Sequence, residues 1–129
     1  MRAVDTNVLV RWITRDDPAQ LDAADAVMST PVLIPLTVLV ELAWTLQGKT
    51  FRMTRAEFAE IAGRMLAIGN ITIPSEDGVR WAIERFAAGA DFANMIHIVA
   101  ARGAVAFVSF ESRLSKLAGT ASPMPIERP

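Results

Sequence analysis

The side chains that could do chemistry in this sequence carry carboxylate or amide oxygens, and they occur at four separated places. They are Asp5, Glu41, Asp91, Asn94 and Glu111. The chain has no cysteine and one histidine, which excludes a thiol nucleophile, a disulfide and a cysteine-ligated zinc site. An oxygen-only set of ligands favours Mg²⁺ or Mn²⁺. Because such an ion activates a bound water and offsets charge on a phosphate, the set predicts hydrolysis of a phosphodiester.

Each of these residues also has a purely structural interpretation. Asp5 and Asp91 stand where a helix N-cap is expected, and Glu111 fits a surface charge. Glu41 is different, because residues 36–46 are apolar nearly all round and predict a buried helix. Burying a carboxylate costs several kcal/mol unless a cation compensates. No lysine or arginine is within helical reach of Glu41, so we expect a cation from elsewhere in the fold, or a metal ion.

The elements that must position these residues are short strands alternating with helices. We expect strands within residues 1–4, 31–35, 71–73 and 105–108, and a fifth at 124–126. This alternation indicates an α/β fold, a three-layer α/β/α sandwich with a parallel four- or five-stranded sheet, as a single domain over residues 1–129. The carboxyl edge of such a sheet binds ligands, and we expect the acidic residues to converge there.

Helix starts are marked by residues that cap the first turn. Asp17 and Pro18 are typical of an N-cap followed by proline at the first helical position. Thr54 and Glu57 have the spacing of a capping box. Ser75 is expected to open a further helix.

Composition indicates a soluble, cytoplasmic protein. The 129 residues are 52% hydrophobic, enough for one core, and the net charge of −1 gives no global basic field. Asp5 falls where a signal peptide would need apolar residues. The longest uncharged run, residues 26–40, is too short to span a membrane and contains Pro31 and Pro35.

The sequence resembles a known family at four segments. Residues 4–10 (VDTNVLV), 38–44 (VLVELAW), 90–97 (ADFANMIH) and 107–111 (FVSFE) are similar to the four motifs of PIN-domain ribonucleases. The resemblance is greatest to VapC-type toxins of toxin–antitoxin pairs. It implies an α/β/α fold, Mg²⁺- or Mn²⁺-dependent endoribonuclease activity on an RNA substrate, and a cognate VapB-like antitoxin that covers the site.

The resemblance also implies roles for individual residues. Asp5, Glu41 and Asp91 would hold the catalytic metal, with Asn94 and Glu111 at its edge or at a second metal. Ligands or water would be oriented by Thr6, Asn7 and Ser109. Basic side chains that would contact RNA phosphates are Arg11, Arg15, Lys49, Arg52 and Arg55.

Two departures from the family pattern favour an alternative function. Asn94 stands where the family commonly has aspartate, which keeps an oxygen ligand but removes a negative charge. Glu111 stands where it commonly has aspartate, which extends the reach of the carboxylate by about 1.5 Å. Asp91 is placed to take over as the charged ligand. The alternative is a catalytically weakened PIN-like domain that binds RNA or an antitoxin without cutting.

Other interpretations are less well supported by the residues. A phosphoacceptor receiver domain needs a lysine near its fourth or fifth strand, and Lys116 lies in a helical pattern instead. His97 follows Asn94 by three residues in an apolar helix, which favours a packed or partner-bonded imidazole over a general base. The aromatic side chains that offer area for a homodimer interface or an antitoxin groove are Trp12, Trp44, Phe51 and Trp81.

Overall fold

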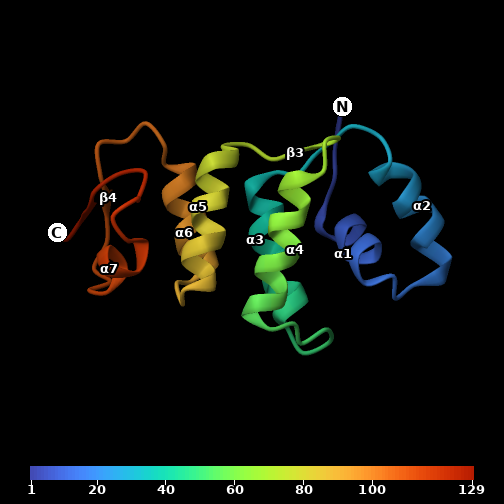
Figure 1. The fold of residues 1–129 in the computed structure, drawn as a ribbon, viewed down its shortest axis with the longest axis horizontal. Coiled ribbons are helices and arrows are strands. Elements are labelled where there is room, and N and C mark those ends of the chain that lie inside the picture. Colours follow the sequence, from blue (N-terminus) through green and yellow to red (C-terminus); the bar gives the residue numbers. More distant parts are fainter. The chain divides into compact units, whose positions relative to one another are not determined.

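The computed structural model describes residues 1–129, which divide into a first unit, Met1–Pro74, and a second unit, Ser75–Pro129. The first unit contains β1 (Arg2–Ala3), α1 (Thr6–Thr14), α2 (Pro18–Met28), β2 (Val32–Leu33), α3 (Leu36–Gln47), α4 (Arg55–Ala67) and β3 (Ile71–Thr72) (Figure 1). The second contains α5 (Glu76–Ala87), α6 (Phe92–Ala100), β4 (Phe107–Val108), α7 (Leu114–Ala118) and β5 (Ile126–Glu127).

The first unit is built on a parallel sheet in the order β1-β2-β3. Val32 occupies the central strand and pairs with Arg2 on one side and Ile71 on the other. The ladder continues past the assigned strands, since the Val4 amide donates to Leu33 at 3.1 Å. Val32 is fully buried, so this strand lies in the core of the unit.

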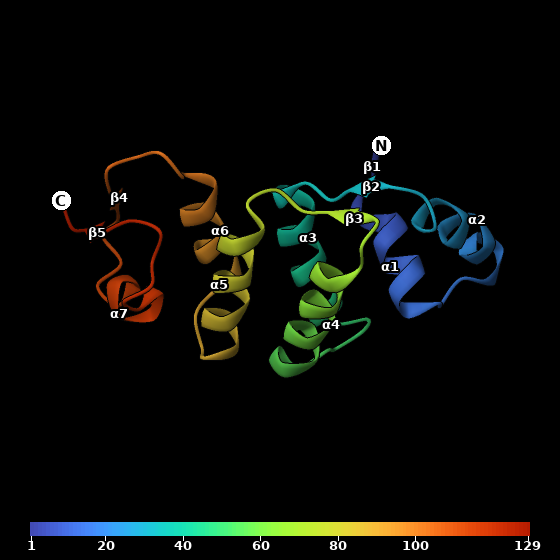
Figure 2. The ribbon, with the colours of Figure 1, turned by 45° about the horizontal axis from the view of Figure 1, so that its top comes forward.

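Helix α1 packs against both α2 and α3, and both views place it between them (Figures 1 and 2). Asp17 caps α2 by accepting from the Ala19 amide, with Pro18 at the first helical position as predicted. The capping box at the start of α4 is also confirmed: Thr54 Oγ1 accepts from the Glu57 amide, and Glu57 accepts in return from the Thr54 amide. Local capping chemistry therefore sets the starts of both helices.

The second unit is centred on the helix pair α5 and α6, which lie side by side in both views (Figures 1 and 2). Gly78 lets the two helices approach closely, because a Cβ at this position would come within 2.8 Å of Val99 Cγ1. Helix α5 is tied to α7 by two bonds to main-chain carbonyls: Trp81 Nε1 donates to Ala118, and Arg85 Nε donates to Leu117 at 2.7 Å. Strands β4 and β5 pair in parallel.

The predicted α/β class with parallel strands is confirmed, and all five expected strands are present. They form a three-stranded and a two-stranded sheet, whereas we expected one sheet of four or five strands. The alternation of patterns predicts where strands occur but does not encode which strands pair. Ser75 occupies the N-cap of α5 with a left-handed φ of 55° and makes no side-chain capping bond, unlike the expected cap. None of the helices combines the length and apolar character needed to cross a bilayer.

Candidate functional site

Asp5 lies between the end of β1 and the start of α1. Its carboxylate caps the helix, because Oδ1 accepts from the Val8 amide at 3.1 Å. The residue is exposed, so Oδ2 remains accessible to a ligand. Thr6, the next residue, is buried at 5% exposure, whereas Asn7 is exposed beside Asp5. The structural interpretation of Asp5 as a cap is therefore confirmed, and it leaves one carboxylate oxygen uncommitted.

Glu41 is exposed, which corrects the prediction that it lies buried in an apolar helix. The buried side of α3 carries Leu39, Leu42 and Leu46, while Thr37, Glu41 and Trp44 are all exposed. These three residues are spaced by four and then three positions, which is the spacing of one helical face. The carboxylate therefore needs no compensating cation, and burial gives no reason to place a metal there.

Asp5 and Glu41 are nevertheless positioned by adjacent elements of the first unit. Strands β1 and β2 run parallel, and each is followed directly by a helix, α1 and α3 respectively. These two helices pack against each other. Both acids thus follow the carboxyl ends of neighbouring strands, as expected for an α/β ligand site.

Asp91 and Asn94 are brought together at the start of α6. Asp91 is the N-cap, and its Oδ2 accepts from the Asn94 amide at 2.9 Å. Asp91 is exposed and Asn94 is half-buried. The carboxylate and the amide side chain therefore sit within one helical turn. His97, expected to be packed or bonded to a partner, is exposed on the same helix, because its position falls outside the buried face of Met95, Ile96 and Ile98.

Ser109 and Glu111 form a tight turn after β4. Ser109 Oγ accepts from the Glu111 amide at 3.0 Å, and Glu111 Oε1 accepts from the Arg113 amide at 3.2 Å. Glu111 is exposed. Its carboxylate is thus oriented by the backbone that leads into α7, with the second oxygen uncommitted.

The predicted ligands suit a hard divalent cation by chemistry, because every one offers oxygen. Asp5 and Glu41 belong to the first unit, and the second unit holds Asp91, Asn94 and Glu111. The structure contains no cluster of three or more histidine, aspartate or glutamate side chains arranged to hold a metal ion. Metal binding by this set stays a prediction.

Two of the five predicted phosphate-binding residues are engaged by acidic neighbours. Arg11 Nη1 contacts both carboxylate oxygens of Asp16 at 3.1 Å, and Arg15 makes a two-pronged contact with Asp25 at 3.0 and 2.8 Å. The bond from Arg15 holds the pKa of the Asp25 carboxyl below its ordinary value. Between α3 and α4, Arg52 Nε donates to the Lys49 carbonyl, and both residues are exposed, as is Arg55.

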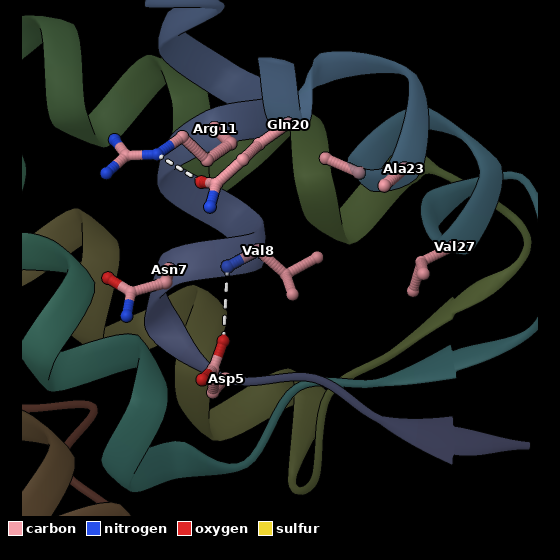
Figure 3. A pocket seen from close by; sticks show the side chains of 8 residues that line it. Asp5, Asn7, Val8, Arg11, Gln20, Ala23 and Val27 are labelled. Atoms are coloured by element: carbon pink, nitrogen blue, oxygen red, sulfur yellow. Dashed lines mark hydrogen bonds between the residues drawn. The ribbon is translucent and has the colours of Figure 1, made fainter. Parts of the chain in front are cut away.

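A pocket of about 310 Å³ opens beside Asp5, between α1 and α2 (Figure 3). Its lining residues are Asp5, Asn7, Val8, Arg11, Gln20, Ala23, Ala24 and Val27. Gln20 was not among the predicted site residues. Its Oε1 accepts from Arg11 Nε at 3.0 Å, a pairing across two helices for which the sequence carries no signal.

Comparison with known proteins identifies the family. A family model described as PIN domain matches residues 2–120. No curated protein and no solved structure matched the chain. The match spans the segments that hold Asp5, Glu41, Asp91, Asn94 and Glu111. The chain therefore belongs to the PIN-domain family, whose members are generally nucleases that use divalent metal ions.

Proposed function

We propose that this protein is a Mg²⁺- or Mn²⁺-dependent endoribonuclease and that it acts in the cytoplasm as the toxin of a toxin–antitoxin pair. The observation that carries the nuclease proposal is the position and hydrogen bonding of the Asp5 carboxylate. In a chain of this family, its carboxylate follows the first strand with one oxygen bonded to the Val8 amide and the other accessible. The proposal treats residues 1–129 as a single PIN-like domain.

The roles of the side chains follow from their local contacts. The Val8 amide fixes the Asp5 carboxylate, so its free oxygen is held in place for a cation. Glu41 supplies a second exposed carboxylate on the helix that packs against α1. From the second unit we propose Asp91 as a charged ligand and Asn94 and Glu111 as further oxygen ligands.

The bound cation would supply an activated water and offset negative charge on the phosphate. The chain's own residues would hold the reacting groups in place. Thr6, Asn7 and Ser109 are proposed to orient ligands or water. Arg11, Arg15, Lys49, Arg52 and Arg55 remain proposed phosphate contacts, with Arg11 and Arg15 already held by acidic side chains in the free protein.

Cleavage of single-stranded RNA by the purified protein tests the proposal. We expect cleavage in Mn²⁺ or Mg²⁺ and none in EDTA. The Asp5→Asn variant, which retains an oxygen for the helix cap, is expected to be inactive. Cleavage that persists in EDTA, or that persists in this variant, would contradict the metal mechanism.

The alternative is a PIN-like domain that binds RNA or an antitoxin without cutting. The observation in its favour is Asn94, which lowers the negative charge beside Asp91. The two functions predict different results for Asn94→Asp, because only the weakened domain has activity to regain.

The toxin role implies two protein partners, a VapB-like antitoxin and a second copy of this chain. Trp44 supports the proposal of a protein-binding surface, because its side chain is 64% exposed on α3, one turn after Glu41. An antitoxin covering this face would bury both the indole and a proposed ligand. Co-expression with the product of a small adjacent reading frame, followed by purification and a cleavage assay, tests this: we expect a complex that does not cut RNA.

A further inference from the structure

The pocket between α1 and α2 has an apolar wall and a polar rim. Val8, Ala23, Ala24 and Val27 form the wall, and the rim is formed by Asp5, Asn7, Arg11 and Gln20 (Figure 3). Its volume of about 310 Å³ lies at the lower end of the range for small-ligand sites, about 300 Å³ upward. Apolar walls with a few convergent polar groups are typical of such sites. The pocket is thus large enough for one small group but not for a long ligand.

Gln20 is exposed, and one hydrogen bond sets the direction of its side-chain amide. Arginine is only a donor, so the oxygen of the Gln20 amide must face Arg11 Nε, at 3.0 Å. Arg11 is in turn held by both oxygens of Asp16. The Gln20 nitrogen, Nε2, therefore lies on the other side of the amide, where Figure 3 shows it directed toward Val8 and Asn7. The two N–H groups of Gln20 Nε2 are therefore available as hydrogen-bond donors at the pocket.

We propose that this pocket receives one base of the RNA strand, and that Gln20 Nε2 donates to a keto oxygen of that base. The inference rests on the proposed ribonuclease function and names a specificity residue for it. Asp5 both lines the pocket and is a proposed metal ligand, so a base held here would lie next to the proposed site of hydrolysis. RNA-binding proteins commonly read single-stranded RNA through splayed bases.

The orientation of Gln20 decides which bases fit. Glutamine pairs with adenine by accepting from the amino group and donating to a ring nitrogen. That mode is weakened here, because one of the two lone pairs of the Gln20 oxygen is already bonded to Arg11. The keto oxygen that we place against Gln20 Nε2 is O6 of guanine or O4 of uracil, the ring positions at which adenine and cytosine carry an amino group. The keto oxygen of cytosine, O2, lies at a different ring position. A base held in this way is therefore expected to be guanine or uracil in preference to adenine or cytosine.

The first test measures nucleotide binding without catalysis. The ¹⁵N-labelled protein in EDTA is titrated with the four ribonucleoside 5′-monophosphates and followed by NMR. We expect guanosine or uridine monophosphate to shift the Gln20 side-chain amide and the backbone amides of Val8 and Ala23. The dissociation constant should be about tenfold lower than for adenosine monophosphate, as expected for one hydrogen bond. Absence of these shifts, or equal binding of adenosine monophosphate, overturns the proposal.

The second test changes the hydrogen-bonding character of Gln20. Gln20→Glu keeps an oxygen for Arg11 and replaces the donors with an acceptor, so the preference should reverse toward adenine or cytosine. Ala26→Glu is the matched control, because it makes the same charge change at an exposed position of α2 that does not line the pocket. We expect Ala26→Glu to keep the original preference. An unchanged preference in Gln20→Glu overturns the proposal.

Mapping of RNA cut sites separates this proposal from the nuclease function. Wild type and Gln20→Glu should differ in the base at one fixed position relative to the cut. If the protein binds guanosine or uridine monophosphate at Gln20 but cuts no RNA, the base pocket stands and the nuclease function fails. If it cuts RNA while no nucleotide shifts Gln20, the nuclease function stands and the base pocket is overturned.

Discussion

The Asp5 carboxylate and the Val8 backbone amide are joined by a hydrogen bond of 3.1 Å through Oδ1. The bond satisfies one of the amide groups that the first turn of a helix leaves unpaired. Because Asp5 is exposed, its other oxygen is accessible. One side chain can therefore cap α1 and bind a cation, and substitution can separate the two roles.

Asp5→Asn and Asp5→Ala are expected to differ in stability and to agree in activity. Asparagine retains the capping oxygen, so the free energy of unfolding should change by less than about 0.5 kcal/mol, whereas alanine should cost about 1 kcal/mol. Both should abolish RNA cleavage, because the negative charge is lost. Urea unfolding and a cleavage assay measure the two effects. Asp17→Asn, at the cap of α2, is the control and should cut RNA at the wild-type rate. Equal unfolding free energies for Asp5→Asn and Asp5→Ala would refute the capping role of Asp5.

Glu41→Gln is expected to lower cleavage without changing stability. The side chain is exposed, so the free energy of unfolding should stay within about 0.5 kcal/mol of wild type. Loss of a proposed ligand charge should weaken Mn²⁺ binding, so half-maximal cleavage should require a higher Mn²⁺ concentration. A titration of Mn²⁺ against cleavage rate measures this. Glu84→Gln, at an exposed position of α5, should leave the titration unchanged, and a similar curve for both variants would remove Glu41 from the site.

Asn94→Asp distinguishes the two proposed functions. We expect wild type to cut RNA and the variant to cut within about tenfold of it, because Asp91 already supplies a charge next to this position. The helix dipole at the start of α6 stabilises the new carboxylate, and the negative charge of Asp91 destabilises it. Each effect is about 0.3 kcal/mol. Cleavage rates of both proteins provide the measurement. An inactive wild type with an active variant would favour the weakened domain instead.

Two glycine substitutions are expected to change stability in opposite directions. At Gly78 a new Cβ would come within 2.8 Å of Val99 Cγ1, and overpacking of this kind costs about 1–3 kcal/mol. At Gly63, within α4, a Cβ meets nothing within 4 Å, so alanine should stabilise by about 0.5–1 kcal/mol. Urea unfolding of Gly78→Ala and Gly63→Ala gives both values. A stabilised Gly78→Ala would contradict the close approach of α5 and α6.

The capping box of α4 should contribute stability that is lost in acid. The backbone amide of Thr54 donates to Glu57, which holds the pKa of the Glu57 carboxyl below its ordinary value. A lowered pKa in the folded state means that this stability is present above the ordinary value, about 4.3, and is lost as the pH falls through the folded value. Glu57→Gln should therefore flatten the dependence of unfolding free energy on pH below about 4.3, measured by urea unfolding. Glu84→Gln provides the comparison. Equal slopes of unfolding free energy against pH in the two variants would contradict a contribution from the capping box.

Elements whose starts depend on local chemistry were predictable from the sequence. Asp17 with Pro18, and Thr54 with Glu57, bond to backbone amides within one turn, so their spacing along the chain contains the whole interaction. The cap at Asp5 was predictable for the same reason.

Features that depend on packing between elements were not predictable. Glu41 was expected to be buried because residues 36–46 are apolar nearly all round, whereas Thr37, Glu41 and Trp44 share an exposed face of α3. The bond between Arg11 and Gln20 depends on the angle at which α1 meets α2, which no local spacing encodes. Which strands pair is likewise decided by packing.

The exposed indole of Trp44 gives the protein an optical reporter of its own. Trp44 is 64% exposed and lies one turn after Glu41, whereas Trp81 is enclosed at 8% exposure and bonded to the Ala118 carbonyl. A quencher in solution should therefore reduce the emission of Trp44 most, that of the half-buried Trp12 less, and that of Trp81 least. Paramagnetic Mn²⁺ arriving at Glu41, or a partner covering α3, would be read as a change in fluorescence without any label.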